Sequence, residues 1–79
     1  MTTIDVNKMI MLWEQVFNVE GLDNSSDFFD LGGHSLLAWR ILQSVEEDCG
    51  VELPIDLLFN YPTIGEFTAA VYEAHGNNG

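Results

Sequence analysis

Basic side chains are nearly absent from this sequence. Its 79 residues include two Lys+Arg and 13 Asp+Glu, which gives a formal net charge of −11. Nucleic acids and anionic membrane surfaces are bound through clustered Lys and Arg, so we expect neither kind of partner. Hydrophobic residues still make up 47% of the chain. Because this share is typical of folded domains, the acidity does not indicate disorder.

Cysteine and long apolar runs are scarce as well. The single cysteine, Cys49, excludes an internal disulfide and a cysteine-based metal cluster. No run approaches the ~18 consecutive apolar residues of a membrane span, and the first residues lack a secretory pattern. We therefore expect a cytoplasmic location.

The short length limits the size of the core. A chain of this size buries only ~60% of its unfolded surface on folding, so its core is thin and leaves no room for a large enclosed active site. We expect residues 1–79 to form one monomeric domain, free-standing or excised from a longer chain. Residues 76–79, Gly-Asn-Asn-Gly, are expected to form a flexible tail.

Apolar residues recur at helical spacing in most of the chain, and the pattern predicts helices over about 4–18, 35–49 and 54–60 and from 64 onward. The alternating stretch 51–53 is too short to build a sheet. The sequence therefore predicts an all-α fold, a four-helix bundle of three main helices and one short helix. The positions expected to face inward are Val6, Met9, Ile10, Trp13, Val16, Phe17, Leu37, Ile41, Val45, Cys49, Ile64, Phe67, Ala70, Val71 and Ala74.

Residues that favour helix ends mark the boundaries of these helices. Thr2 or Thr3 is expected to cap the first helix, Gly21 to end it, and Gly50 to end the second. The stretch Thr63-Ile64-Gly65-Glu66 has the form of a capping box at the start of the last helix.

A long loop is predicted over residues 22–34, and loops of this length in small domains are usually functional. Phe28 or Phe29 is expected to anchor it in the core. Asp23, Ser25 and Asp27 alternate as in a calcium-binding EF-hand. However, the sixth position is Phe28 instead of Gly, and the twelfth is His34 instead of Glu, so we expect no calcium site.

A hydrolase site built on Asp30, His34 and Ser35 is also disfavoured. Neighbours in sequence seldom orient as nucleophile and base, and a substrate cavity would not fit. Cys49 lies at an inward-facing position, where it is expected to act as a small hydrophobe. We therefore expect no catalytic residue and no metal ligand.

Gly32 and Gly33 precede Ser35 at the predicted start of the second helix. A hydroxyl there is accessible to another enzyme, and a phosphodiester on it would lie at the positive end of the helix dipole, a favourable contribution of ~0.3–1 kcal/mol. Alternatively, Ser35 is only the N-cap of the helix. The physical arguments alone leave both interpretations open.

The segment Asp-Phe-Phe-Asp-Leu-Gly-Gly-His-Ser-Leu-Leu-Ala, residues 27–38, resembles the attachment motif of peptidyl carrier proteins, the thiolation domains of nonribosomal peptide synthetases. Residues 50–54, 58–59 and 61–64 are also similar to that family, and the resemblance covers nearly the whole chain. It implies a four-helix bundle in which Ser35 carries a covalent 4'-phosphopantetheine arm, with Gly33 and His34 beside it.

The resemblance implies a carrier that catalyses nothing itself and holds an aminoacyl or peptidyl group as a thioester on the arm. The implied partners are a phosphopantetheinyl transferase with coenzyme A, an adenylation enzyme, and condensation, thioesterase or tailoring enzymes. His34 resembles the peptidyl type, because fatty-acid carriers usually have Asp at that position. The alternatives are an acyl carrier for another acyl group and a helical interaction module that is never modified.

A carrier must fit several enzymes in turn, so we expect an exposed apolar surface near Ser35. Leu36 and Trp39 are the candidates, with Leu57 nearby and Arg40 as a charged contact. Alternatively, Trp39 packs inward and enlarges the core. The acidic run 46–48 at the end of the second helix opposes the helix dipole. It is interpreted as a solvated face, with steering of basic partners as the alternative.

Overall fold

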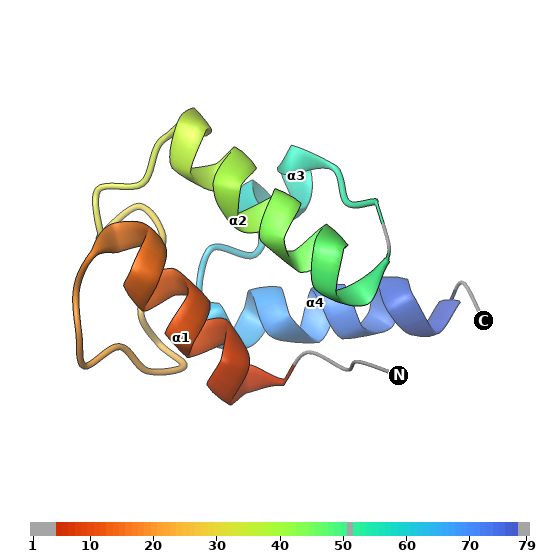
Figure 1. Cartoon of the computed structure of the whole chain (residues 1–79), viewed down its shortest axis with the longest axis horizontal. Coiled ribbons are helices and arrows are strands. Elements are labelled where there is room, and N and C mark those ends of the chain that lie inside the picture. The colour runs from red at the N-terminus through yellow and green to blue at the C-terminus, as the bar shows by residue number, and fades with distance from the viewer. Residues whose placement is uncertain (1–4, 51, 78–79) are drawn as a thin grey trace.

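A computed structural model describes residues 5–50 and 52–77, and this part of the chain forms a helical bundle (Figure 1). Its helices are α1 (Val6–Phe17), α2 (Ser35–Cys49), α3 (Ile55–Asn60) and α4 (Ile64–Asn77). Within those residues, β-type pairing is limited to one isolated bridge between Asp27 and Thr63. The predicted all-α four-helix fold is confirmed.

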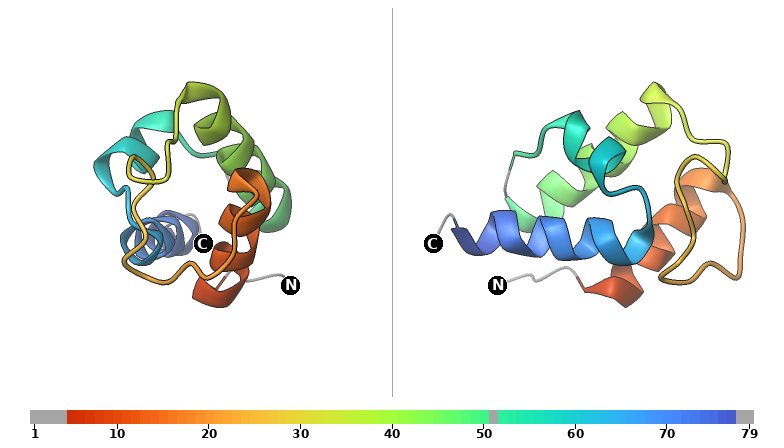
Figure 2. Two further views of the ribbon diagram at one scale, coloured as in Figure 1. Left: turned by 90° about the vertical axis from the view of Figure 1, so that its left-hand side faces the viewer. Right: turned by 180° about the vertical axis from the view of Figure 1, so that it is seen from behind.

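The helices enclose one core. α1 packs against α2 and α4, and α3 packs against the same two helices. Figures 1 and 2 show the long loop crossing one end of the bundle, beside the end of α1 and the start of α4. The buried apolar side chains are Met9, Trp13, Phe28, Ala38, Ile41, Leu42, Val45, Leu53, Leu58, Ile64, Phe67 and Val71. No helix in the described ranges is both long and apolar enough to cross a membrane.

Aromatic side chains fill the loop end of this core. The Trp13 ring lies 6.0 Å from the Phe28 ring, edge to face, and 6.2 Å from the Phe67 ring, measured between centroids. Aromatic pairs at these separations contribute about 0.5–1.5 kcal/mol beyond the area they bury. The thin core therefore depends on a few large rings from α1, the loop and α4.

The start of α1 differs from the prediction. Asp5 is the N-cap, and its Oδ1 accepts a hydrogen bond from the Lys8 backbone N–H at 2.9 Å. A carboxylate serves here because it accepts from the free N–H groups of the first turn and interacts favourably with the helix dipole. Thr2 and Thr3, the predicted caps, lie outside the described residues.

The predicted end of α1 near residue 18 is confirmed, but a different residue ends the helix. The helix ends with Asn18 in the left-handed conformation (φ 58°), three residues before the predicted stop at Gly21. Asn tolerates this conformation because its short polar side chain hydrogen-bonds locally. The Gly21 N–H donates to Glu14 Oε2 at 3.0 Å, and the Leu22 N–H donates to the same oxygen at 3.2 Å. Glu14 thus fixes the chain as it leaves the helix.

The predicted bounds of α2 are confirmed, with Gly50 in the left-handed conformation as its C-cap. Of its predicted inward positions, Ile41 and Val45 are buried, while Leu37 and Cys49 are only half-buried. Ala38 and Leu42 complete the buried face instead, because the contact with α1 and α3 is wider than a single row at four-residue spacing.

The later helices follow the predicted pattern closely. α3 begins at Ile55 with Pro54 as its N-cap, one residue later than predicted. The predicted capping box of α4 is present in part, because the Glu66 carboxylate binds the Thr63 hydroxyl and not its backbone N–H. The Glu66 N–H donates to Thr63 Oγ1 at 3.2 Å, and the Thr63 hydroxyl donates to Glu66 Oε1 at 3.0 Å.

The predicted tail begins inside a helix, because α4 extends to Asn77. Residues 78–79 lie outside the described part of the chain, so a flexible end there stays a prediction.

Replacing Thr63 by Ala tests this capping box. The change removes the acceptor for the Glu66 N–H, so the free energy of unfolding should fall by about 0.5–2 kcal/mol. Urea unfolding followed by circular dichroism measures the change. Gln15→Ala, at an exposed position of α1, serves as the control and should stay within about 0.5 kcal/mol. Equal stability of the two variants would contradict the role assigned to the cap.

Candidate functional site

The long loop is held against the start of α4 by backbone hydrogen bonds. The Phe28 N–H donates to the Pro62 carbonyl at 2.7 Å, and the Ile64 N–H donates to the Ser26 carbonyl at 3.1 Å. A third bond joins the Gly65 N–H to the Asn24 carbonyl at 2.9 Å. These bonds link residues that are 34 to 41 positions apart in sequence, so the loop has a defined position although it is not helical.

Carboxylates within the loop shape its turns. Asp23 Oδ1 accepts from the Ser25 N–H at 2.9 Å and from the Ser25 hydroxyl at 2.7 Å. These bonds, led by the Ser25 hydroxyl, hold the pKa of the Asp23 carboxyl below its ordinary value. Asp27 Oδ1 accepts from the N–H groups of Phe29 and Asp30. Both carboxylates therefore bind the loop's own backbone.

Phe28 is the residue that anchors the loop in the core, as one of the two predicted candidates. Its side chain is fully buried, whereas Phe29 is exposed. Gly33 lies directly against the Phe28 ring, and a Cβ at Gly33 would lie 2.5 Å from ring carbons. The Gly33 N–H also donates to the Phe28 carbonyl at 2.9 Å. Gly32 adopts φ +85°, a left-handed conformation that favours glycine. Gly32 thus allows the chain to turn, and Gly33 allows the backbone to pack closely against the Phe28 ring.

This turn brings Ser35 to the start of α2. Ser35 is the first helical residue, and His34 occupies the N-cap position without a side-chain cap hydrogen bond. The interpretation of Ser35 as the N-cap is therefore wrong. Ser35 is exposed, and its hydroxyl has no hydrogen-bond partner among the described residues. The site presents a free hydroxyl beside uncapped N–H groups at the positive end of a 15-residue helix.

The residues of the disfavoured hydrolase site do not assemble. Asp30, His34 and Ser35 are all exposed, and no hydrogen bond joins them within residues 5–50 and 52–77. The Asp30 backbone N–H is bound by Asp27. In the described part of the chain, no group of three or more His, Cys, Asp or Glu side chains is placed to hold a metal ion.

The exposed face of α2 carries large apolar side chains close to Ser35. Leu36 is 61% exposed and Trp39 is 55% exposed, so the alternative that Trp39 packs inward is wrong. Arg40 is also exposed. Leu57, the candidate on α3, is half-buried and packs against the core, so it offers only part of its surface.

Three further aromatic side chains are exposed, and none of them was expected from the sequence to form part of a surface. Phe29 and Phe59 stack with ring centroids 5.9 Å apart and an interplanar angle of 27°, and Tyr61 is also exposed. The adjacent Phe28-Phe29 pair was the available signal, because Phe28 enters the core from this turn while its neighbour Phe29 stays exposed.

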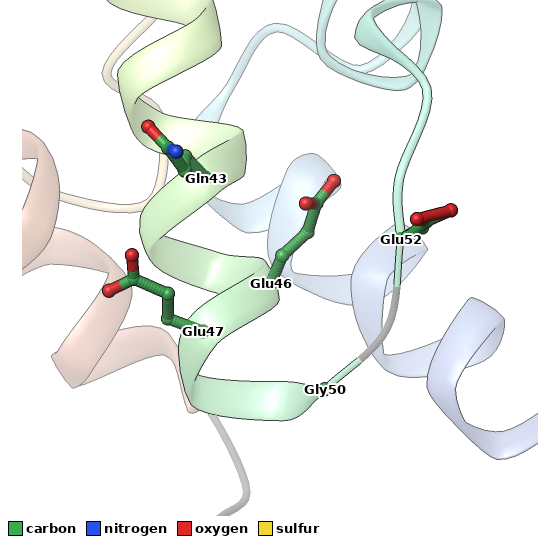
Figure 3. Close-up of a pocket in the computed structure, with 5 residues that line it drawn as sticks. All are labelled: Gln43, Glu46, Glu47, Gly50 and Glu52. Carbon is green, nitrogen blue, oxygen red and sulfur yellow. The ribbon is translucent and has the colours of Figure 1, made fainter.

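The acidic run at the end of α2 is not simply a solvated face. Glu46 Oε2 accepts a hydrogen bond from the Leu53 N–H at 2.9 Å, which ties the segment before α3 to α2. Figure 3 shows Glu46 directed toward that segment and Glu47 directed to the other side of the helix. Gln43, Glu46, Glu47, Gly50 and Glu52 line a shallow depression of about 350 Å³.

Comparison with known families matches residues 7–71 to the model described as "phosphopantetheine attachment site". Tyrocidine synthase 3 of Brevibacillus parabrevis is 45% identical over 71 residues, which cover 89% of this chain. The match spans 1% of that protein's length, so the similarity concerns one small part of a much longer protein.

Two solved structures share the fold over most of both chains. One is the complex of the phosphopantetheine transferase Sfp with coenzyme A and a peptidyl carrier protein (TM-score 0.83, 34% identity, 92% of this chain and 95% of that chain). The other is BlmI, a type-II acyl carrier protein of Streptomyces verticillus involved in bleomycin biosynthesis (TM-score 0.82, 28% identity, 86% and 82%).

The contact between Gly33 and Phe28 predicts the effect of adding one methyl group. Gly33→Ala should lower the free energy of unfolding by about 1–3 kcal/mol, because the ring and the turn cannot both keep their positions. Chemical denaturation measures this loss. In a Phe28→Leu background, where the opposing side chain is smaller, the same substitution should cost less. An equal loss in both backgrounds would show that Gly33 is required for another reason.

The uncapped start of α2 predicts that His34→Asp stabilises the protein. The new carboxylate would accept from the free N–H groups of the first turn, raising the free energy of unfolding by about 0.5–1 kcal/mol. Thermal and urea unfolding at neutral pH measure the gain. His34→Ala, which offers no acceptor, is the control. No gain over that control would mean that the N-terminus of α2 is already satisfied.

Proposed function

The chain belongs to the phosphopantetheine attachment site family, and we propose that it acts as a peptidyl carrier protein with the 4'-phosphopantetheine arm on Ser35. The observation that carries this assignment is the position of the Ser35 hydroxyl, exposed and free of hydrogen bonds at the first position of α2. The match with the family model over residues 7–71 includes this serine.

The surroundings of Ser35 fit a phosphodiester. The first N–H groups of α2 receive no side-chain cap, and the positive end of a helix favours an attached anion by ~0.3–1 kcal/mol. Gly33 brings no side chain beside the hydroxyl. His34, also exposed, adds a group that can donate hydrogen bonds from its ring. Attachment therefore calls for no rearrangement of the fold, only access for the transferase.

The arm supplies a terminal thiol that holds an aminoacyl or peptidyl group as a thioester. The residues of this chain position the arm and recognise partners, and we propose that they catalyse no step. Ser35 provides the anchoring oxygen, and the loop held by Phe28 keeps that oxygen in place. Tethering raises the effective concentration of the carried group at each partner's active site. The rigid turn before Ser35 and the open surface around it suit this role.

Partners would dock on the apolar surface next to the serine. Leu36 and Trp39 form its centre on α2, Arg40 adds a positive charge, and the half-buried Leu57 contributes its edge. A contiguous exposed apolar patch on a small domain usually marks an interaction site. The expected partners are a phosphopantetheinyl transferase with coenzyme A, an adenylation enzyme, and condensation, thioesterase or tailoring enzymes.

The carried group is proposed to be an amino acid or a peptide. His34 and the similarity to tyrocidine synthase 3 support this class over a fatty-acyl or other acyl group. The likeness to a carrier in complex with a phosphopantetheine transferase supports modification of this chain over the alternative of an interaction module that is never modified. The expected cytoplasmic location and monomeric state stay predictions.

Modification at Ser35 is tested by incubating the protein with coenzyme A, magnesium and a broad-specificity phosphopantetheinyl transferase. Intact mass spectrometry should show the addition of one phosphopantetheine. Ser35→Ala should remain unmodified while keeping its fold, because Ser35 makes no side-chain hydrogen bond. Ser44→Ala, a matched substitution further along α2, should be modified fully. Modification of the Ser35→Ala protein, or none of the parent protein, would contradict the proposed function.

A further inference from the structure

Two exposed aromatic rings join the long loop to α3. Phe29 in the loop and Phe59 near the end of α3 stack with their ring centroids 5.9 Å apart and an interplanar angle of 27°. Both side chains are exposed and lie outside the hydrophobic core, so core packing does not explain why they meet. A ring pair at this separation is attractive. The stack therefore links two segments that are far apart in sequence.

The backbone of Phe29 belongs to the turn that leads to Ser35. The Phe29 carbonyl accepts a hydrogen bond from the Gly32 N–H at 3.1 Å. The Phe28 carbonyl accepts one from the Gly33 N–H at 2.9 Å. Because α2 begins with Ser35 shortly after this turn, a displacement of the turn would also move the Ser35 hydroxyl.

This turn is held on two sides by aromatic rings. On the inner side, the buried Phe28 ring packs edge to face against Trp13, with 6.0 Å between the centroids. On the outer side, the exposed Phe29 ring stacks on Phe59. The Phe59 ring also lies 6.4 Å from the Phe28 ring. Phe59 thus contacts both aromatic residues of the turn, although it belongs to a different helix.

We propose that Phe29 and Phe59 are positioning residues for the modification of Ser35. Their stacked rings hold the outer side of the turn and keep the Ser35 hydroxyl in the orientation needed for transfer of phosphopantetheine. The inference rests on the proposed function, and it assigns the rings a role through the backbone of the turn. Small displacements of a reacting group lower reaction rates strongly, so a contact outside the site can control the rate at the serine.

Amide hydrogen exchange of the unmodified protein tests the effect on the turn without any enzyme. Phe29→Leu and Phe59→Leu each remove the stack and keep an apolar side chain. Either substitution should speed exchange of the Gly33 amide by about two- to tenfold, the factor expected from one aromatic pair. The two substitutions combined should have no larger effect than either alone, because they remove the same contact.

Val71→Ala is the matched control for a general loss of stability. It opens a cavity in the core on α4, so it should speed exchange of the Leu42 amide, in the middle of α2, through global unfolding. It should leave exchange of the Gly33 amide unchanged, because the turn opens locally. Equal acceleration of both amides in every variant would show that the turn opens only with the whole protein, and would overturn the proposal.

Transfer of phosphopantetheine from coenzyme A, followed by intact mass spectrometry, measures the consequence at Ser35. For Phe29→Leu and Phe59→Leu, kcat should fall about two- to tenfold while KM for the carrier stays within about twofold, because the displaced hydroxyl reacts more slowly once the carrier is bound. Phe59→Tyr keeps the stacked ring and should retain the parent rate. Tyr61→Ala removes an exposed ring outside the stack and should also retain it.

A higher KM with an unchanged kcat would mean that the rings contact the transferase directly, and would overturn the positioning role while leaving the carrier function intact. Parent-like transfer by both leucine variants would overturn it as well. Absence of any modification of the parent protein contradicts the proposed function itself, and the positioning role with it.

Discussion

The contact between the Phe28 ring and the backbone at Gly33 is the constraint on which the site depends. Phe28 is fully buried against Trp13 and Phe17, so its position is fixed by the core. Gly33 lies within van der Waals distance of that ring because it has no Cβ, and its N–H closes the turn on the Phe28 carbonyl. The start of α2 follows immediately. The core therefore sets the position of Ser35 through the Phe28 ring, which the backbone approaches closely because Gly33 has no side chain.

The two faces of α2 have different roles. Its inner face supplies core residues to contacts with α1 and α3, and its outer face carries Ser35, Leu36 and Trp39. A thin core of this kind cannot enclose a substrate, but a carrier does not need to. We propose that α2, which begins at the serine, provides both a rigid point of attachment and a surface that several enzymes can recognise.

The acidic side chains stabilise local structure in addition to giving the chain its negative net charge. Carboxylate oxygens accept backbone N–H groups at helix starts, at helix ends and in turns, where the helical hydrogen-bond pattern leaves donors free. The residues that do so are Asp5, Glu14, Asp23, Asp27 and Glu46. The sequence has only two basic residues, and these five carboxylates interact with backbone N–H groups. The chain as a whole stays strongly negative, with a net charge of −11.

Local patterns in the sequence were sufficient to predict the helical fold, the bounds of α2 and the capping box at Thr63. Each depends on residues within one or two turns of each other, and the attachment motif around Ser35 is equally local. Tertiary contacts decided the rest. Phe28 rather than Phe29 entered the core, and Leu57 became half-buried, because each outcome depends on which distant segment packs there. The hydrogen bonds between the loop and the start of α4, and the bond from Leu53 to Glu46, join residues far apart in sequence or across a loop. No periodicity encodes such bonds, so only the folded chain fixes the loop that positions Ser35 at the start of α2.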